Sequence, residues 1–335
     1  MALSEVTTST ATDLEGWTQP AQVATPVRIG TGVWKFARRK PLGAFCGLII
    51  LLLVIVGDLV PETVNKMASV AGVGDQPVPY LADQLADNLG FIYRYDEINV
   101  MHRLKGGSAD HLLGTDALGR DIFSRLLYGT RSAVMVAFGA TFISAILQVL
   151  INVPSGYYGG WFDKLAYRLV DVMDSLPTLV ILLVVLGLSG SGLWQLIVAI
   201  GLISGLSGGR TLRGQTIQLM ASPFIEAARV IGASDRRIMM RYVIPNIMPL
   251  IILTATLRLG IIVLLEATLS FLGYGTPPPF PSWGQMLSLD GREFMRSQPG
   301  LAIFPGVAIG ILVFSFNLFG DALRDVLDPR LRGSR

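Results

Sequence analysis

The chain contains very little cysteine, histidine or charge. Cys46 is the only cysteine among the 335 residues, which excludes an intrachain disulfide and a cysteine-rich metal site. His102 and His111 are the only histidines. Charged residues make up 15% of the chain and hydrophobic residues 51%, a composition too apolar for an ordinary soluble domain. We therefore expect the lipid bilayer to be the main solvent of this chain.

A nucleotide-binding loop is also missing. The pattern G-x-x-x-x-G-K-[ST], which cradles phosphate groups, occurs nowhere in the sequence. If ATP drives the protein, a different subunit must bind it. The net charge is only +3, and the basic residues cluster between apolar runs, as they do when positive charge sorts loops to the inner side of a membrane. We therefore expect membrane lipid, and no nucleic acid, as a partner.

Long apolar runs predict an all-α integral membrane protein with six transmembrane helices. One crossing needs about 20 apolar residues. As a single helix, the uncharged stretch 175–209 would be about 52 Å long at ~1.5 Å per residue, too long for a ~30 Å hydrocarbon core. It must turn back at the glycines and serines of residues 187–192. The six expected spans cover residues 41–60, 132–154, 165–188, 193–208, 247–272 and 301–320.

Positive charge predicts which side each loop occupies. Six spans place both termini and the six arginines between residues 210 and 241 in the cytoplasm, whereas five spans would place those arginines outside. The aromatic and basic residues 34–40 are typical of an interfacial elbow helix or of a plain positively charged anchor. The expected organisation is a disordered cytoplasmic tail (1–31), an elbow helix and first span (32–60), an extracytoplasmic loop with an interfacial helix (61–131), a five-helix core (132–321) and a cytoplasmic tail (322–335).

Residues 205–209, GLSGG, match the nucleophile pattern G-x-S-x-G and suggest an intramembrane serine protease that uses Ser207. Such an enzyme needs a histidine base on another span, and both histidines fall in the outer loop. Gly201, Gly205 and Gly209 instead recur every fourth residue, which is typical of a helix face that another helix approaches closely. We therefore expect these glycines to serve helix packing.

A metal site is weakly indicated. Asp110, His111 and Asp116 could in principle ligate a metal in the outer loop. Two histidines without tight ligand spacing are more typical of a solvated loop. No metal is expected.

Four charged residues fall within or beside the apolar runs. Arg258 and Glu266 lie in the fifth span, and their spacing of eight residues allows both to border one cavity and line a pathway. The alternative is that Arg258 binds backbone carbonyls at a helix crossing and Glu266 lies near the outer interface. Asp171 and Asp174 are expected at the inner interface, within reach of the basic residues that precede them.

Residues 222–246, SPFIEAARVIGASDRRIMMRYVIPN, predict a polar helical hairpin between two apolar runs. Ser222 and Pro223 are favourable at the start of a helix, Gly232 breaks that helix, and Ser234 can cap a second helix over residues 235–244. Apolar residues beside the charges suggest a docking surface for a soluble partner, namely Ile225, Val230, Ile231, Ile238 and Met239.

This hairpin resembles the EAA loop of ABC importer permeases. Glu226, Ala227 and Ala228 are followed by Gly232 and, after nine more residues, by YVIP at 242–245, where the family usually has Ile-x-Leu-Pro. Three segments resemble the second permease subunit of the dipeptide and oligopeptide importer branch: HLLGTDALGRDIFSRLLYGTR (111–131), LEATLSFLGYGTPPPFPSWGQML (265–287) and FNLFGDALRDVLDPRLR (316–332). The similarity covers most of the chain from about residue 34.

The resemblance implies a type I importer permease fold and a transport subunit without catalytic activity. It implies a heterodimer with a homologous permease in a bacterial or archaeal plasma membrane, two ATPase subunits that bind ATP and Mg²⁺, and an extracytoplasmic solute-binding protein. No cofactor is implied in this chain. The hairpin would be a coupling helix seated in an ATPase cleft, with the ATPase-coupling residues Glu226, Ala227, Ala228, Arg229, Gly232, Ala233, Ser234, Asp235, Arg236 and Arg237.

Two other functions remain as alternatives. One is the intramembrane protease, and the other is a secondary transporter driven by an ion gradient. A secondary transporter would more often show paired broken helices and mid-membrane carboxylates. Within the importer hypothesis, the substrate would be a peptide, a metal complex or a sugar.

Overall fold

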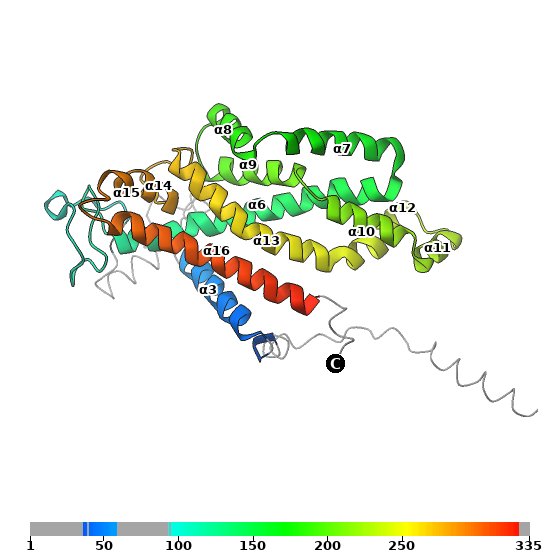
Figure 1. Ribbon diagram of the computed structural model, residues 1–335, viewed down its shortest axis with the longest axis horizontal. Helices are drawn as coiled ribbons and strands as arrows, with labels where there is room; N and C mark the ends of the chain where they lie inside the picture. The colour runs from blue at the N-terminus through cyan, green and yellow to red at the C-terminus, as the bar shows by residue number, and fades with distance from the viewer. Residues whose placement is uncertain (1–35, 39, 59–92, 94, 328–335) are drawn as a thin grey trace, which may run out of the picture. The chain divides into compact units, whose positions relative to one another are not determined.

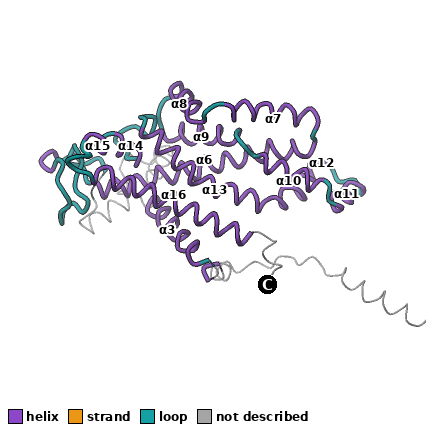
Figure 2. The backbone as a smooth tube through the Cα atoms, viewed as in Figure 1, coloured by secondary structure: helices purple, strands orange, loops and turns teal. Residues whose placement is uncertain are grey.

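The computed structural model describes residues 36–38, 40–58, 93 and 95–327, and every regular element within them is a helix (Figure 1 and Figure 2). The expected tail 1–31, most of the outer loop up to residue 92, and residues 328–335 lie outside the described part. Of the expected elbow helix, residues 36–38 are described, and they are helical.

The apolar runs of the sequence form the long helices. In chain order the α-helices are α3 (Pro41–Asp58), α6 (Ile122–Tyr158), α7 (Gly160–Ser175), α8 (Thr178–Ser189), α9 (Leu193–Leu206), α10 (Arg210–Met220), α11 (Pro223–Val230), α12 (Asp235–Ile238), α13 (Ile244–Phe271), α14 (Trp283–Ser288), α15 (Asp290–Glu293) and α16 (Gly300–Leu327). A 3₁₀ turn, η2 (Val100–His102), precedes α6, and a π-helical turn, η3 (Met239–Val243), precedes α13.

Helix α6 is longer than predicted. It begins at Ile122 and continues without a break to Tyr158, so the expected interfacial helix and the second span are one helix. Asp121 caps it, because its Oδ2 accepts a hydrogen bond from the Ser124 N–H at 2.7 Å. The separate interfacial helix was a wrong prediction. The prediction ended the helix before the uncharged run that begins at Ser132, whereas Arg125 and Thr130 are buried inside the structure and the helix continues through them.

Two expected spans are bent pairs of helices. α7 and α8 meet at an angle of 91°. Pro177 causes this break, because it lacks an N–H and favours the extended conformation that Leu176 adopts (φ −101°, ψ 141°). α9 and α10 meet at 48°, at Gly208 and Gly209, whose φ angles of 77° and 82° are left-handed. The inner loop expected after the fourth span is instead helical from Arg210 onward.

The described residues contain three helices long and apolar enough to cross a membrane: α6, the continuous run Asp235–Phe271 and the run Gly300–Val326. The number rises to five if each bent pair is one span. The apolar part of α3, Pro41–Ile55, is shorter than these. Length and composition alone therefore support three to five crossings, and the sixth expected crossing depends on α3.

Helix α6 is the central helix of the bundle. α9, α10 and α13 pack against it, and α16 packs against α13 (Figure 1). Buried apolar side chains form three clusters along α6. Ile122 and Ala133 pack with α13, α14 and α16, Val136 and Ala140 pack with α8 and α9, and Val153 packs with α10, α11 and α13.

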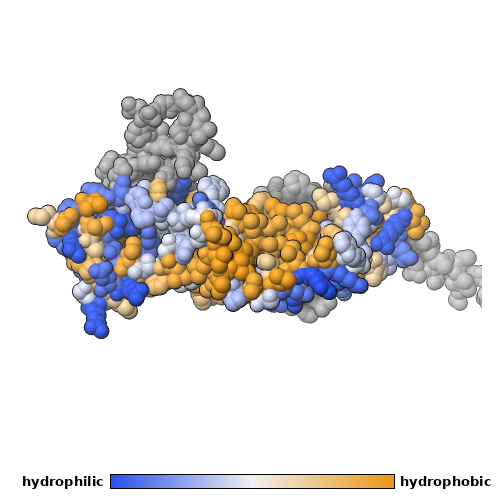
Figure 3. All heavy atoms as spheres, turned by 90° about the horizontal axis from the view of Figure 1, so that it is seen from above, coloured by the Kyte–Doolittle hydropathy of each residue, from blue (hydrophilic) through white to orange (hydrophobic). Residues whose placement is uncertain are grey.

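One face of the bundle has a broad apolar band across its middle (Figure 3). On the face shown in Figure 3, hydrophobic side chains form this band and hydrophilic side chains lie at both of its ends. Large apolar side chains such as Phe142, Leu150, Ile261 and Phe314 are exposed on the long helices. An exposed apolar surface of this size is unusual for a soluble monomer and is the surface that lipid covers.

Candidate functional site

The expected hairpin, residues 222–246, contains a helix and a tight turn. Helix α11 ends in a Schellman motif, in which the Ala233 N–H donates to the Ala228 carbonyl at 3.0 Å and the Gly232 N–H donates to the Arg229 carbonyl at 2.9 Å. Gly232 has a φ of 80°, a conformation that other residues rarely adopt. The predicted role of Gly232 as helix breaker is therefore confirmed.

The second limb of the hairpin differs from the prediction. Helix α12 ends at Ile238, and the π-helical turn η3 connects it directly to α13. Pro245 accounts for the wider turn, because a proline cannot donate to the carbonyl four residues earlier and its ring crowds that carbonyl. Ser222 and Ser234 precede the two helices as predicted, but neither side chain makes a capping hydrogen bond.

The apolar residues of the hairpin form a buried set and an exposed set. Ile225 and Ile238 are fully buried against α6, α10 and α13, and Met239 is half-buried, so their predicted exposure was wrong. Val230 and Ile231 are 82% and 80% exposed at the turn. The buried set holds the hairpin on the bundle, and the exposed pair remains available to another protein.

Tyr157, at the end of α6, orients two of the predicted coupling residues. Its hydroxyl donates to Asp235 Oδ1 at 2.6 Å, and the Arg229 guanidinium carbon lies 5.7 Å from the centre of its ring. Ala228 is buried and Ala233 is half-buried. The other predicted coupling residues are exposed, namely Glu226, Ala227, Gly232, Ser234, Arg236 and Arg237.

Arg258 ties α13 to the broken end of α9. It donates to the carbonyl oxygens of Ser204 and Ser207, at 2.5 and 3.3 Å, and lies 3.4 Å from the Ser144 hydroxyl of α6. Carbonyls at the end of a helix lack the N–H groups of a following turn. A charge at this depth costs about 3 kcal/mol on insertion scales, and these hydrogen bonds offset part of that cost. The helix-crossing alternative for Arg258 is confirmed.

Glu266 does not share the cavity that Arg258 lines. That small cavity lies between α6, α10 and α13 and is lined by Thr141, Ala145, Gln148, Leu212, Ile251, Thr254, Ala255 and Arg258. The Glu266 carboxyl is buried elsewhere and accepts a hydrogen bond from the Ser270 hydroxyl at 2.8 Å. The prediction that both residues border one cavity does not hold for this cavity.

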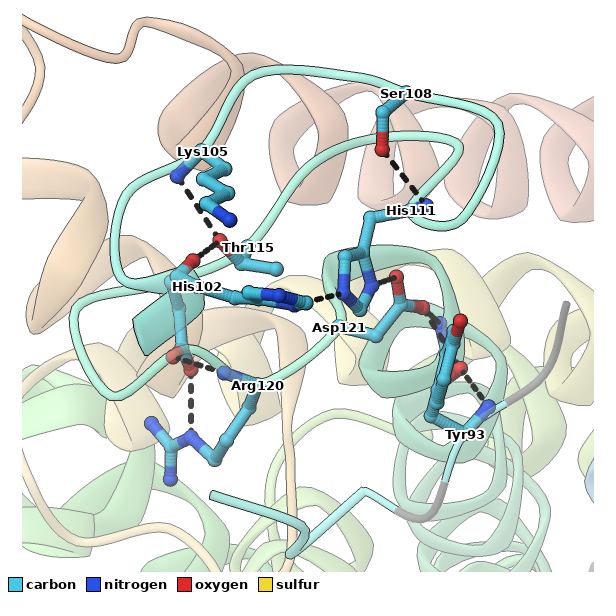
Figure 4. Close-up of polar contacts among 10 residues, drawn as sticks. Tyr93, His102, Lys105, Ser108, His111, Thr115, Arg120 and Asp121 are labelled. Atoms are coloured by element: carbon cyan, nitrogen blue, oxygen red, sulfur yellow. Dashed lines mark hydrogen bonds and ion pairs between the residues drawn. The ribbon is translucent and has the colours of Figure 1, made fainter. Parts of the chain in front are cut away.

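The weak metal candidates Asp110, His111 and Asp116 do not come together. No group of three or more His, Cys, Asp or Glu residues is placed to hold a metal within the part of the chain that the structure describes. His111 is buried, with its Nδ1 3.0 Å from Asp121 Oδ1 and its Nε2 3.1 Å from His102 Nδ1 (Figure 4). This hydrogen-bonded chain fixes the outer loop to the first turn of α6.

Asp116 is the centre of a second buried network in the outer region. Its Oδ1 accepts the N–H groups of Leu118 and Arg120, both at 2.9 Å. Its Oδ2 lies 2.6 Å from Arg120 Nε and 3.6 Å from Arg125 Nε. Arg120 Nη2 also lies 3.7 Å from Asp290 Oδ2 of α15, and burial together with the nearby Asp116 carboxylate raises the pKa of Asp290. Two arginines therefore depend mainly on one carboxylate.

Ion pairs between α7 and α10 were not predicted. Arg213 donates from Nε and Nη2 to the Asp163 carboxylate at 2.6 and 2.5 Å. Arg210 Nη2 lies 2.8 Å from Asp171 Oδ1 and 3.5 Å from Asp174 Oδ2. Arg210, and not the basic residues of α7, is therefore the partner of these two acids. The spacing of Asp163 and Asp174 could have indicated these contacts, because residues eleven apart lie on one face of a helix.

The chain matches a sequence model of a transport family described as "Binding-protein-dependent transport system inner membrane component", over residues 148–333. This match covers more than half of the chain, including the whole hairpin. The chain belongs to this family. It is 36% identical over 315 residues to the glutathione transport system permease protein GsiD of Escherichia coli O1:K1 and of Shigella sonnei, with 94% of each chain covered. A solved structure of the inward-facing MetNI methionine ABC transporter resembles 58% of this chain and 94% of its own, with a TM-score of 0.43 and 20% identity.

Family membership confirms the resemblance seen in the EAA pattern. The chain is a permease subunit of an ABC importer, a transport component and not an enzyme. A subunit of this kind works with ATPase subunits and a solute-binding protein, and it spans the inner membrane several times.

The glycines around Ser207 serve packing in this permease. A Cβ atom at Gly201 would lie 2.8 Å from the Cβ of Ile143, and one at Gly205 would lie 2.8 Å from the Cβ of Leu147. Real Cβ atoms do not approach so closely, so α9 reaches α6 only because these positions are glycine. The packing prediction is confirmed for this pair of helices.

We expect Gly205→Ala to destabilise the permease by about 1–3 kcal/mol, because the added methyl group forces α9 away from α6. Gly214→Ala is the matched control. Gly214 lies in α10 with nothing within 4 Å of an added Cβ, so alanine there should stabilise α10 by about 0.5–1 kcal/mol. Thermal unfolding of the purified variants measures both effects, and equal effects of the two substitutions would contradict the packing account.

Proposed function

We propose that this permease is one of two homologous membrane subunits of an ATP-driven importer for peptides or related small solutes. Its six crossings would be α3, α6, the pair α7–α8, the pair α9–α10, α13 and α16, in the type I importer arrangement with both termini in the cytoplasm. The substrate class rests on the 36% identity to permeases that are named for glutathione, a peptide. Broken helices also occur in ion-driven transporters, and membership of the importer family argues against that alternative.

The observation that carries this proposal is the exposed turn of the hairpin. Val230 and Ile231 are exposed at the turn, and the exposed arginines 236 and 237 follow in α12, while the rest of the hairpin is anchored by buried isoleucines and by Tyr157. An apolar patch rimmed by charge on a firmly held element is typical of a protein docking site. We assign it to an ATPase subunit, which would bind ATP and Mg²⁺, and this chain would need no cofactor.

The helices suggest how movement of the hairpin reaches the membrane. Residues from Asp235 to Phe271 form one continuous helical run, so displacement of α12 would be transmitted along α13. Arg258, in the middle of α13, holds the carbonyls at the break between α9 and α10. Closure of the ATPase pair on ATP would therefore shift the broken helices, and the two permease subunits would rock between inward-open and outward-open states.

Reconstitution tests the proposed function. The complete complex, with both permeases, both ATPases and the solute-binding protein, is placed in lipid vesicles, and uptake of radiolabelled glutathione and dialanine is measured. We expect uptake of at least one of them that requires ATP, Mg²⁺ and the binding protein. Uptake driven by an ion gradient without ATP would contradict the proposal, as would ATP hydrolysis without uptake of either peptide.

A further inference from the structure

Asp171, Asp174 and Arg210 form an ion group close to the contact between Arg258 and Ser207. Arg258 stands close to the centre of the 28-residue helix α13 and binds the Ser207 carbonyl. Arg210 follows Ser207 by three residues and pairs with the two acids. Three residues of chain extend at most about 10 Å. The ion group is therefore close to the level of Arg258 along α13. In the arrangement proposed above, this level is within the membrane, deeper than the inner interface predicted for the acids.

Two helix breaks meet at this ion group. Asp174 is the last residue but one of α7, directly before the bend at Pro177, and Arg210 is the first residue of α10, directly after the bend at Gly208 and Gly209. Broken helices within a membrane are tolerated where they are buried in protein or line a water-filled cavity. In transporters they mark the places where solutes are bound.

The charges are placed against the preference of the helix dipole. Acidic side chains are favourable at a helix N-terminus and basic side chains at a C-terminus. Here Asp171 and Asp174 occupy the last turn of α7, and Arg210 occupies the first turn of α10. Helix stability therefore does not explain these residue types at these positions.

The ion group is also open on one side. The Asp171 and Arg210 side chains are 63% and 62% exposed, whereas Asp163, one turn from the start of α7, is mostly buried with its partner Arg213. Exposed charges at mid-membrane are not stable against lipid and face water or other protein. We propose that Asp171, Asp174 and Arg210 line the water-filled translocation pathway and contact the solute there.

The chemistry of the group indicates the class of solute. Two carboxylates attract an ammonium group, and a guanidinium forms paired hydrogen bonds with a carboxylate. A solute that carries both groups, such as a short peptide with free termini, can exchange its own charges for those of the Asp171–Arg210 pair. This assignment rests on the proposed function and names the solute-contacting part of it.

Cysteine accessibility tests the position of the group. Cys46 is the only cysteine of this chain, so in a Cys46→Ser permease, separated from the other subunits by electrophoresis after labelling, a single new thiol is measured. Arg210→Cys leaves Asp171 and Asp174 in place, and Phe142→Cys is the control in the apolar band, where Phe142 is 68% exposed. Each variant is assembled into the full complex in vesicles, and its rates of reaction with a cationic trimethylammonium thiosulfonate and with an anionic sulfonate thiosulfonate are measured. Each rate is divided by the rate at which the same reagent reacts with mercaptoethanol in solution.

We expect Arg210→Cys to react at least tenfold faster than Phe142→Cys, and at least tenfold faster with the cationic than with the anionic reagent. Asp174→Cys keeps the 2.8 Å contact between Arg210 and Asp171. Its labelling rate is measured in parallel, in case the Arg210→Cys complex does not assemble. Asp174→Cys should also react at least tenfold faster than the control. Thiols that react no faster than Phe142→Cys, or show no preference for the cationic reagent at position 210, would overturn the proposal.

Protection tests the solute class on the same vesicles. Dialanine should slow the labelling of Arg210→Cys at least threefold, whereas N-acetyl-dialanine, which lacks the ammonium group, should not. Equal protection by both peptides, or by neither, would overturn the assignment to a dipolar solute. ATP-dependent uptake by the Cys46→Ser complex distinguishes failure of this inference from failure of the proposed function. Uptake without accessible thiols contradicts this inference alone, whereas absence of uptake contradicts the proposed function.

Discussion

Replacement of Ile231 by aspartate is expected to weaken binding of the ATPase subunit at least 30-fold and to abolish ATP-dependent uptake. Ile231 is 80% exposed at the turn of the hairpin, so in this account it becomes buried only in the complex. A charge introduced at the centre of an interface costs 2 kcal/mol or more, which corresponds to about 30-fold in affinity. The amount of ATPase that co-purifies with the membrane subunits measures the effect.

The same substitution in the loop that precedes α6 serves as the control. Leu112 is an exposed apolar residue of the outer loop, and Leu112→Asp should leave the bound ATPase within twofold of the unmodified complex. Neither substitution should change the stability of the permease by more than about 0.5 kcal/mol, because both side chains are exposed. Full retention of ATPase by the Ile231→Asp complex would contradict the proposed docking surface.

The second large effect concerns the outer network. Asp116→Asn is expected to destabilise the permease by about 3–5 kcal/mol, because Arg120 and Arg125 would lose the carboxylate that they share in a buried site. The amide would also place an N–H₂ group beside the guanidinium of Arg120 or lose the backbone hydrogen bonds of Oδ1. Thermal unfolding of the purified permease measures the loss.

Asp290→Asn is the control for that prediction. Asp290 lies 3.7 Å from Arg120, and burial raises its pKa, so its ionised form contributes less and its removal should cost under about 1 kcal/mol at neutral pH. The raised pKa also predicts the direction in which stability changes with pH. A carboxyl that binds protons more tightly when folded stabilises the protein increasingly as the pH falls through the raised pKa, so the unmodified permease should gain stability relative to Asp290→Asn on acidification. A larger loss for Asp290→Asn than for Asp116→Asn would contradict this division of roles.

Much of the helical framework could be predicted from sequence, because charge-free apolar runs locate membrane helices directly. The runs at α3 and α13 begin and end within three residues of the expected limits, and α16 begins one residue early and ends seven residues late. The breaks were harder to predict. Pro177 and the Gly208–Gly209 pair are visible in the sequence, but whether such residues bend, end or merely mark a helix depends on what packs around them.

The position of the candidate site in the chain was predicted, but the direction in which its apolar side chains face was not. The EAA pattern located the hairpin and the turn at Gly232, and both are present. The pattern did not reveal which apolar side chains face inward, because Ile225 and Ile238 are buried against the flanking helices α10 and α13 and against α6, and this packing is a tertiary arrangement. The buried pairing of Arg125 with Asp116 was not predicted either.

Cross-linking from the hairpin tests the central claim most directly. A photoreactive amino acid at Ser234, which is exposed beside the turn, is compared with one at Phe142 in the apolar band, in membranes that contain the complete importer. The account predicts a cross-link from Ser234 to the ATPase subunit and none from Phe142. Cross-links to the ATPase from Phe142, or none from Ser234 in complexes that take up peptide, would contradict it.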